Sequence, residues 1–538
     1  MESKIVKGTD VHLEANQGNI AKAQQFEYRN INKDGQLVIP LRSVVIFLVA
    51  TLVSGVALEL LPLTGSGFFN ALHLSCILKP QRDVNPSNAS TDMIPQFAVF
   101  GNSRTENHLN HVLNILEQFG YKRTSVDGDW DLLWAHDYPF LKMPVLLKNL
   151  QPHQRVNHIP GCGFITNKVD LSITPHLAFL PKAFKLPMQQ NDFLKYASEH
   201  PDAIFVEKNN EHRNITIKSP HEFKLNASDS FVQEFIKDPL LVDGYKFDIG
   251  VYVLITSVDP LRIYIYAGDV LFRFCAVKYH PFDSKQVDKY VVGDDYLPTW
   301  EVPSLVKYYK KHAGSMRGAF DAYVRDQSLN PSVIWPQVED IVRGTVLAKE
   351  KDIARLLRAY KTKNFFDLMR FDMIIDDQLR VYLMEVNMSP NLSSAHFKPN
   401  SLLYKQILYS AFNLVGIGSP VKSSSFRDRH NEVAEMITAE KNLAIKLDSC
   451  AEYDCDKNCN VFACKLCLSC ISGSDYDLLA NAHREHLHKI DMKRVFPKPI
   501  LNPESYDIEV EVQNLSEKNA WLTRWYHGKC LYDRSWCL

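Results

Sequence analysis

The hydrophobic pattern near the start of the chain predicts one apolar segment between two polar ones. Residues 1–43 are polar, with scattered charge and no strong periodicity, which is typical of a disordered tail. Residues 44–63 form an apolar run of the length that crosses a hydrocarbon core of about 30 Å. Residues 64–94 carry Gly, Pro, Ser and Asn and indicate a stem. We therefore expect a single-pass transmembrane helix rather than a cleaved signal peptide or a buried core helix.

The next segment predicts a small α/β domain over residues 95–190. Phe97–Ser103 and Asp129–His136 have the composition of strands. Between them, apolar residues recur at helical spacing up to Gly120, which suits a helix C-cap. This strand–helix–strand order is typical of α/β domains.

A second, larger α/β region is expected over residues 191–420, followed by a linker and a separate Cys-rich module over residues 421–538. Four segments are rich in β-branched and aromatic residues and predict strands: Ala203–Asn210, Phe231–Ile236, Lys246–Thr256 and Leu261–Cys275. Two segments have helical periodicity: Asp352–Tyr360 and Ser401–Val415. The predicted fold class is α/β (α+β).

The stretch FDMIIDDQLRVYLMEVN predicts a β-hairpin with an acidic open end. Its two strands are joined by DDQL, a turn-prone sequence. Alternation places Glu385 and Asn387 on one face of the second strand. A turn centred between Gln378 and Leu379 would place Asp372 directly opposite Glu385.

Two buried carboxylates beside an amide need a compensating charge. Unpaired, they would repel each other, and burial would cost each ion several kcal/mol. Oxygen ligands of this kind suit Mg²⁺, which commonly bridges substrate phosphates. Asp372, Glu385 and Asn387 are therefore candidate metal ligands. The alternative is a half-exposed hairpin whose carboxylates meet nearby lysine or arginine side chains.

Other polar positions at strand ends suit a nucleotide. Lys208 ends an apolar strand and could contact phosphate, or it could be a solvated strand end. Gln233–Ile236 could offer backbone amides and an apolar wall to a purine, or it could be a core strand. Lys246 and Asp248 share a face and could bind ribose and phosphate, or they could form a surface ion pair.

Composition and charge exclude little beyond one class of partner. The 538 residues are 46% hydrophobic and 23% charged, with a net charge of −1, which gives no argument for nucleic acid.

The C-terminal region holds an even set of cysteines: Cys450, Cys455, Cys459, Cys464, Cys467, Cys470, Cys530 and Cys537. In a lumen they predict disulfides, whereas in the cytosol they would predict zinc together with nearby His483, His486 and His488.

The charges flanking the apolar segment favour one topology. Arg29, Lys33 and Arg42 precede it, whereas Lys79 and Arg82 follow it. By the positive-inside rule, the N-terminus is cytosolic and the main body lumenal. Three Asn-X-Ser/Thr sequons also suit a lumenal body: Asn88, Asn214 and Asn226.

The blocks QEFI, PLLVDGYKFDIGVYVLITSVDPLRIYIY, LFRF and FDMIIDDQLRVYLMEVNMSPNL, in this order, resemble the tubulin–tyrosine ligase-like family. The likeness covers residues 155–400, and QRVNHIPGCGFITNKVDL resembles the stretch that precedes the ATP-binding half. It implies an ATP-grasp fold, ATP and two Mg²⁺ ions. It further implies a carboxylate activated as an acyl phosphate and attacked by an amine, with glutamate added to tubulin or another acidic tail by a polyglutamylase-type member.

The resemblance also implies roles for individual residues. Its ATP-binding positions are Lys208, Arg213, Gln233, Glu234, Phe235, Ile236, Lys246 and Asp248. Its magnesium ligands are Asp372, Glu385 and Asn387. Arg273 in LFRF would be catalytic, facing the acyl phosphate or the amino-acid carboxylate.

Three departures from the family pattern favour an alternative. Gly250 stands where the family has an arginine after K-F-D-[IL], and the loop Asn209–Ile217 has no glycine. The family's H-L-T-N motif is not evident in Lys289–Trp300. The chain could thus be a membrane-anchored ATP-binding protein with impaired catalysis. A lumenal body would instead act on a non-tubulin acidic protein, and the sequons at Asn387 and Asn391 overlap the metal site.

Overall fold

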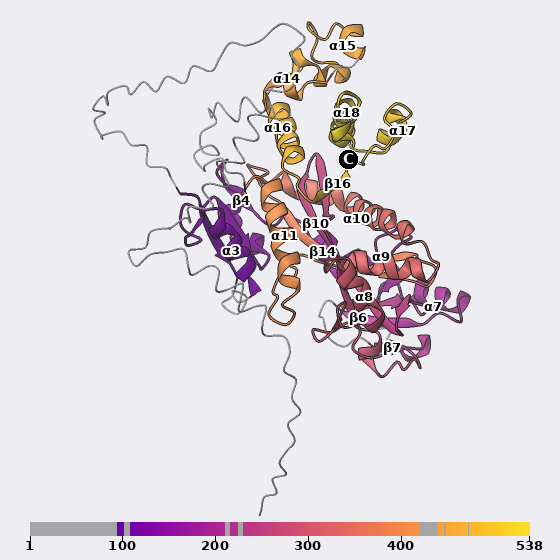
Figure 1. Cartoon of the computed structure of the whole chain (residues 1–538). Coiled ribbons are helices and arrows are strands. Elements are labelled where there is room, and N and C mark those ends of the chain that lie inside the picture. Colours follow the sequence, from indigo (N-terminus) through magenta and orange to yellow (C-terminus); the bar gives the residue numbers. More distant parts are fainter. Residues whose placement is uncertain are drawn as a thin grey trace, which may run out of the picture. The chain divides into compact units, whose positions relative to one another are not determined.

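The computed structural model describes residues 94–101, 108–209, 216–223, 230–418, 438–445, 448–471 and 473–538 (Figure 1). The predicted polar tail and transmembrane helix lie outside the described residues, as do Arg213 and the sequons at Asn88, Asn214 and Asn226. Of the predicted stem, only Ile94 is described. Among the described residues, no helix is long and apolar enough to cross a membrane.

A four-stranded parallel sheet lies in the region predicted as a small α/β domain, and its core is continuous with that of the central sheet. Its strand order is β2 (Lys122–Arg123), β1 (Gln96–Phe100), β3 (Leu132–Ala135) and β4 (Arg155–Val156). Helix α3 (Asn110–Gln118) buries Val112, Ile115 and Leu116, the apolar stripe that its helical periodicity predicts. Gly120 follows the helix with φ +83°, a left-handed conformation that favours glycine, so the predicted C-cap is confirmed.

A second, antiparallel sheet has the order β5 (Ala183–Lys185), β8 (Ser230–Glu234), β6 (Phe205–Asn209) and β7 (Thr216–Lys218). Helix α7 (Gln190–Glu199) packs on it through Phe193, which contacts Phe184 and Phe205 edge-on or tilted. Because β5 pairs with β8, this unit begins before residue 191, where the sequence analysis placed the boundary.

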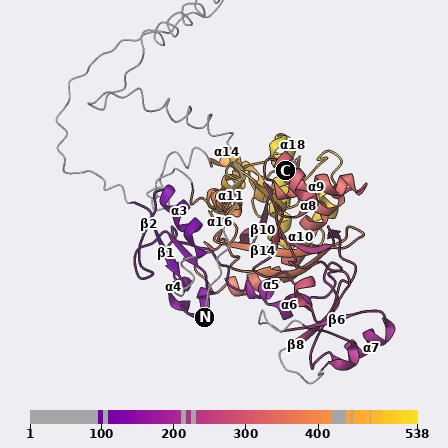
Figure 2. The same ribbon diagram turned by 60° about the horizontal axis from the view of Figure 1, so that its bottom comes forward.

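The central sheet has eight strands and is built around β10 (Tyr245–Val258). One edge of β10 pairs with β12 (Leu271–Phe274) and then with β11 (Leu261–Tyr266); its other edge pairs with β14 (Asp367–Ile375). The remaining strands are β9 (Leu241–Val242), β13 (Leu297–Pro298), β15 (Val381–Asn387) and β16 (Met492–Phe496). The ribbon views show β10 and β14 side by side (Figures 1 and 2).

The other helices of the described residues differ in length, and several of them contact this sheet. The long helices are α8 (Pro303–Lys311), α9 (Met316–Asp326), α10 (Ile334–Leu357), α11 (Asn400–Leu414), α16 (Gly473–Leu487) and α18 (Glu517–Tyr532). The short ones are α4 (Pro144–Lys148), α5 (Gly163–Thr166), α6 (Lys168–Ser172), α14 (Glu440–Leu443), α15 (Asp448–Glu452) and α17 (Ile508–Val512). All nine residues of β14 are buried, which places the predicted acidic strand inside the main core.

The C-terminal region has a hydrophobic cluster of its own but contributes one strand to the central sheet, so it is less separate than the sequence predicted. Strand β16 pairs antiparallel with β11. Glu485 of α16 accepts two hydrogen bonds from the buried Arg262 of β11, at 2.8 and 3.0 Å. These contacts join the tail to the same fold as the ligand pocket described below.

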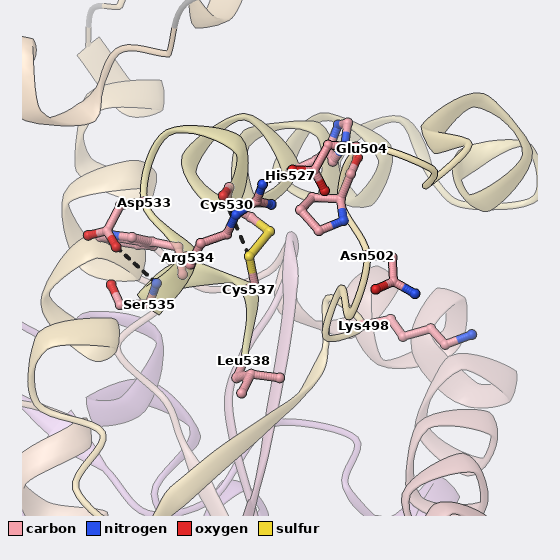
Figure 3. The surroundings of a disulfide bond; sticks show 12 residues. Lys498, Asn502, Glu504, His527, Cys530, Asp533, Arg534, Ser535, Cys537 and Leu538 are labelled. Atoms are coloured by element: carbon pink, nitrogen blue, oxygen red, sulfur yellow. Dashed lines mark hydrogen bonds and ion pairs between the residues drawn. A yellow bond between two sulfur atoms is a disulfide. The ribbon is translucent and has the colours of Figure 1, made fainter.

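The eight C-terminal cysteines form four disulfides, which is one of the two alternatives that the sequence left open for them. The pairs are Cys450–Cys467, Cys455–Cys464, Cys459–Cys470 and Cys530–Cys537. Figure 3 shows Cys530 of α18 bonded to Cys537 at the chain end. His483 and His486, which the zinc alternative would have used, instead contact the ring of Trp536.

Candidate functional site

A pocket opens where the antiparallel sheet of β5, β8, β6 and β7 faces the central sheet. Most of the predicted ligand residues line it: Lys208, Glu234, Phe235, Ile236, Lys246, Asp248, Arg273, Asp372 and Glu385. Gln233 and Asn387 lie directly behind, hydrogen-bonded to residues of the lining. The folded chain thus brings together residues that are far apart in the sequence, whereas Arg213 lies outside the described part of the chain.

Part of the pocket lining is apolar. Its lining includes Val206, Phe231, Phe235, Ile236, Val291, Val292, Ile374 and Met384. The N–H groups of Glu234 and Phe235 donate to Lys182 and Ile204 within the protein, so these two amides are not the purine donors that the sequence analysis considered. Their segment offers an apolar surface suited to a flat ring. Val291 and Val292 come from the region that lacks the family's H-L-T-N motif.

Two lysines approach the pocket from different sheets. Nζ of Lys208 on β6 donates to Oε1 of Gln233 at 2.8 Å, and Nζ of the buried Lys246 on β10 donates to the carbonyl of Tyr290 at 2.7 Å. The pKa of Lys208 is lowered to about 8, chiefly by burial; Glu385 opposes this shift, and the positive charges of Lys168 and Lys246 contribute to it. A lysine with this pKa is still mostly charged at pH 7 and can attract phosphate.

The acidic hairpin has the predicted register. Asp372 of β14 pairs with Glu385 of β15, and the ladder shifts by one residue between Asp372 and Met373. At this shift one residue of β15 is left without a partner on β14. The hairpin can therefore close in a tight turn at 376–380 and still pair Asp372 with Glu385 at its open end. Across β14, Asp372 also pairs with Gly250 of β10.

Cationic side chains neutralise the acidic residues. Arg273 on β12 makes two 2.8 Å hydrogen bonds to Asp248 and one of 2.9 Å to Asp372. Arg370 on β14 donates to both oxygens of Asp372, at 2.6 and 2.8 Å. Asp248 and Asp372 therefore pair with arginines, as the alternative for the hairpin expected, but Asp372 is buried rather than half-exposed.

Glu385 and Asn387 complete the network. Nζ of Lys168 lies 2.7 Å from Oε2 of Glu385. Nδ2 of Asn387 donates to Asp372 at 2.9 Å and to Glu385 at 3.2 Å. Burial raises the pKa of Asp248, as does Asp372, while Arg273 opposes the shift. These groups hold one another in a single, closely packed arrangement.

Two residues of this network, Arg370 and Lys168, are not among the candidates that the sequence predicts. Arg370 lies two positions before Asp372, so strand alternation could have placed it on the acidic face. Lys168 lies in the block NKVDL, but its distance from Glu385 in the sequence gives no sign of their contact. Only the packing of α6 against β15 brings those two together.

The donor set fits a divalent cation of the magnesium type. Asp372 and Glu385 present carboxylate oxygens at the pocket, and Asn387, whose Nδ2 donates to both, lies directly behind them. Hard oxygen donors are those that Mg²⁺ prefers, and it usually retains waters and shares phosphate oxygens. A cation bound here would share Asp372 with two guanidinium groups.

The two sheets, with a cationic and acidic pocket where they meet, define an ATP-grasp-like protein. The model of the tubulin-tyrosine ligase family matches residues 146–425, more than half of the chain. The chain belongs to this family, among its polyglutamylase-type members.

Named relatives support that assignment. A probable tubulin polyglutamylase, ttll-15, of Caenorhabditis elegans is 39% identical over 85% of this chain and 90% of its own length. The human tubulin polyglutamylase TTLL6 is 27% identical over 56% of this chain and 36% of its own. The human tubulin monoglutamylase TTLL4 is 26% identical over 80% and 38%, so this chain spans well under half of the two human proteins.

Proposed function

We propose that the protein is an ATP- and magnesium-dependent ligase that joins glutamate to a carboxylate of an acidic protein tail. The observation that carries the proposal is the convergence of Lys208, Arg273 and the Asp372–Glu385 pair on one pocket with an apolar wall. That combination suits a nucleoside triphosphate and the charge of a transferring phosphoryl group. The names of the relatives supply glutamate as the amino acid and tubulin as one acceptor.

The reaction has two balanced steps. A carboxylate oxygen of the acceptor attacks the γ-phosphorus, the bond to ADP breaks, and an acyl phosphate forms. The amine nitrogen of glutamate then attacks the acyl carbon, the bond to phosphate breaks, and the nitrogen loses a proton as the amide forms. Magnesium held by Asp372, Glu385 and Asn387 would supply charge neutralisation for the phosphates.

The chain's own side chains have distinct tasks in this scheme. Lys208, on β6, attracts the phosphate oxygens, and Phe235 and Ile236 give the adenine an apolar surface. Arg273 is fixed by Asp248 and Asp372 while still lining the pocket, so its guanidinium is oriented before substrate arrives. Preorganised charge of this kind stabilises the transition state without reorganisation.

Transfer of radiolabelled glutamate tests the proposal. The full chain is incubated with MgATP, labelled glutamate and either tubulin or a polyglutamate peptide, and label in the acceptor is measured. Glu385→Gln should abolish transfer, because it removes a ligand charge. Glu301→Gln, at an exposed position outside the pocket, is the matched control and should retain activity. Binding of MgATP without transfer to any acceptor would favour the catalytically impaired alternative, which the glycine at position 250 suggests.

A second acceptor class is favoured by the disulfides. Four disulfides suit an oxidising compartment, and β16 ties their region to the sheet that carries the pocket. We propose that the chain is anchored by residues 44–63 with its main body in the lumen, where the acceptor would be a non-tubulin acidic protein. Glycosidase-sensitive mobility of the full-length protein supports this topology; resistance, with tubulin as the acceptor, supports the cytosolic one.

The sequons near the site allow a sharper version of that experiment. Asn391 is exposed, whereas Asn387 is half-buried and hydrogen-bonded to Asp372 and Glu385. A glycan on Asn387 is incompatible with its proposed role as a ligand. Asn391→Gln and Asn387→Gln, examined separately for glycan loss, would therefore show whether either position is modified.

A further inference from the structure

Position 250 leaves a space that a neighbouring arginine fills. A Cβ added to Gly250 would lie 2.9 Å from Cδ and 3.3 Å from Nε of Arg370. Real Cβ atoms essentially never approach a non-bonded heavy atom of another residue within 3.0 Å, so a side chain at position 250 would have to displace the middle of the Arg370 side chain. Gly250 and Arg370 are therefore a matched pair.

The strand register explains why they meet. Gly250 pairs with Asp372, and Tyr252 pairs with Arg370, so these residues share one face of the β10–β14 ladder. Arg370 extends diagonally over Gly250 and donates to both oxygens of Asp372. The absence of a side chain at position 250 is what allows this path.

Arg370 is buried and charged. Its exposed fraction is 7%, and its guanidinium sits beside a carboxylate that Arg273 also binds. Burial alone disfavours the charge, but Asp372 outweighs it and holds the pKa of Arg370 above its usual range. A bidentate pairing of this kind fixes the plane and position of the carboxylate.

We propose that Arg370 is a positioning residue that takes over, from the next strand, the arginine charge that the family pattern places at position 250. It acts through Asp372, holding that carboxylate ready for magnesium and for the phosphates beside Arg273. The inference rests on the proposed ligase function. By this inference, the glycine at position 250 does not mean that the arginine charge is lost. The charge has moved from β10 to Arg370 on the neighbouring strand β14.

The test compares four variants of the full chain. Arg370→Ala removes the guanidinium; Arg370→Lys keeps the charge without the planar fork; Gly250→Arg with Arg370→Ala moves the arginine back to β10. Arg355→Ala is the control, since Arg355 is exposed on α10, does not line the pocket and pairs with Asp352 three residues away. Glutamate transfer gives kcat and KM, and a fluorescent ATP analogue titrated at several Mg²⁺ concentrations gives nucleotide binding.

We expect Arg370→Ala to lower kcat by about 100-fold and to raise the Mg²⁺ concentration needed for half-maximal nucleotide binding by about tenfold. Arg370→Lys should recover little, because an ammonium cannot make the bidentate contact. The kcat of the double variant should be at least tenfold higher than that of Arg370→Ala. A merely structural role of Arg370 would not give this rescue. The control should match the wild type.

Two results would overturn the inference. One is wild-type turnover and Mg²⁺ dependence in Arg370→Ala. The other is a double variant that binds MgATP but transfers glutamate no better than Arg370→Ala. If Arg370→Ala does not fold, a fully active Arg370→Lys also overturns it, and an active double variant supports it. If the wild type transfers no glutamate, the proposed function fails, but the Mg²⁺ dependence of nucleotide binding still tests the role of Arg370.

Discussion

Asp372 on β14 lies opposite Glu385 on β15, and the ladder shifts by one residue immediately beyond this pair. Each carboxylate has its own cationic partner: Arg370 for Asp372, and Lys168 for Glu385. Since these cations come from different parts of the fold, the two carboxylates can lie side by side in a buried sheet without strong repulsion. This arrangement determines the behaviour that we expect of the site.

Lys168 should be needed for nucleotide binding. Lys168→Met removes the charge 2.7 Å from Glu385 and one of the cationic groups lining the pocket. We expect the dissociation constant of MgATP to rise about tenfold, the value of one lost charge-assisted contact. Isothermal titration calorimetry measures it, with the exposed Lys351→Met as control. An unchanged affinity would contradict the assignment of Lys168 to the site.

Nucleotide affinity should fall as the pH rises through about 8. Burial lowers the pKa of Lys208 to about 8, so its positive charge is lost above that pH. Affinity measured between pH 7 and 9.5 should decline in the wild type and stay flat in Lys208→Arg, which remains charged. A decline of equal size in both would show that another group is responsible.

The lowered pKa of Lys208 should make the protein more stable as the pH rises, whereas it makes nucleotide binding weaker. The folded state releases the Lys208 proton near pH 8, whereas the unfolded chain keeps it to about 10.5. Because the unfolded state then binds more protons, the Lys208 contribution to the free energy of unfolding increases between these pH values. Urea unfolding at pH 7.5 and 9.5 should therefore show a smaller gain in Lys208→Met than in the wild type.

The buried ion pair between Glu485 of α16 and Arg262 of β11 should be important for stability. Glu485 accepts hydrogen bonds from Arg262, Thr256 and Tyr264. Glu485→Gln leaves a buried guanidinium uncompensated, so we expect a loss of about 3–5 kcal/mol in denaturant unfolding. Glu509→Gln, which breaks the exposed pair with Arg524, should cost less than about 1 kcal/mol. Equal losses would mean that the Arg262 contact is not a buried ion pair in solution.

Thiol labelling should distinguish disulfides from zinc. Unfolding without reductant should expose only two reactive cysteines among those of the described region, Cys162 and Cys275, because the other eight are paired. Mass spectrometry after alkylation locates the labelled peptides. Labelling of Cys450–Cys470 with release of zinc would instead support a cytosolic, metal-bound region.

Local patterns were sufficient to predict much of the site. Period-2 alternation in the FDMII and RVYLMEVN segments placed Asp372 opposite Glu385, and the same rule placed Lys246 and Asp248 on one face. The helical stripe before Gly120 predicted α3 and its C-cap. These features depend on residues close in the sequence, where the backbone geometry fixes which side chains are neighbours.

The sequence alone determined which face of the acidic hairpin is polar, where several of the strands lie, and that eight C-terminal cysteines form an even set. The single strand predicted over Leu261–Cys275 is in fact two strands, β11 and β12. The tertiary structure decided that Lys168 meets Glu385, that Arg370 fills the space above Gly250, and that β16 joins the central sheet. Alternation assigns a side chain to a face, but it does not say which strands become neighbours. That choice depends on long-range packing, since contacts between distant segments form only when the whole core closes.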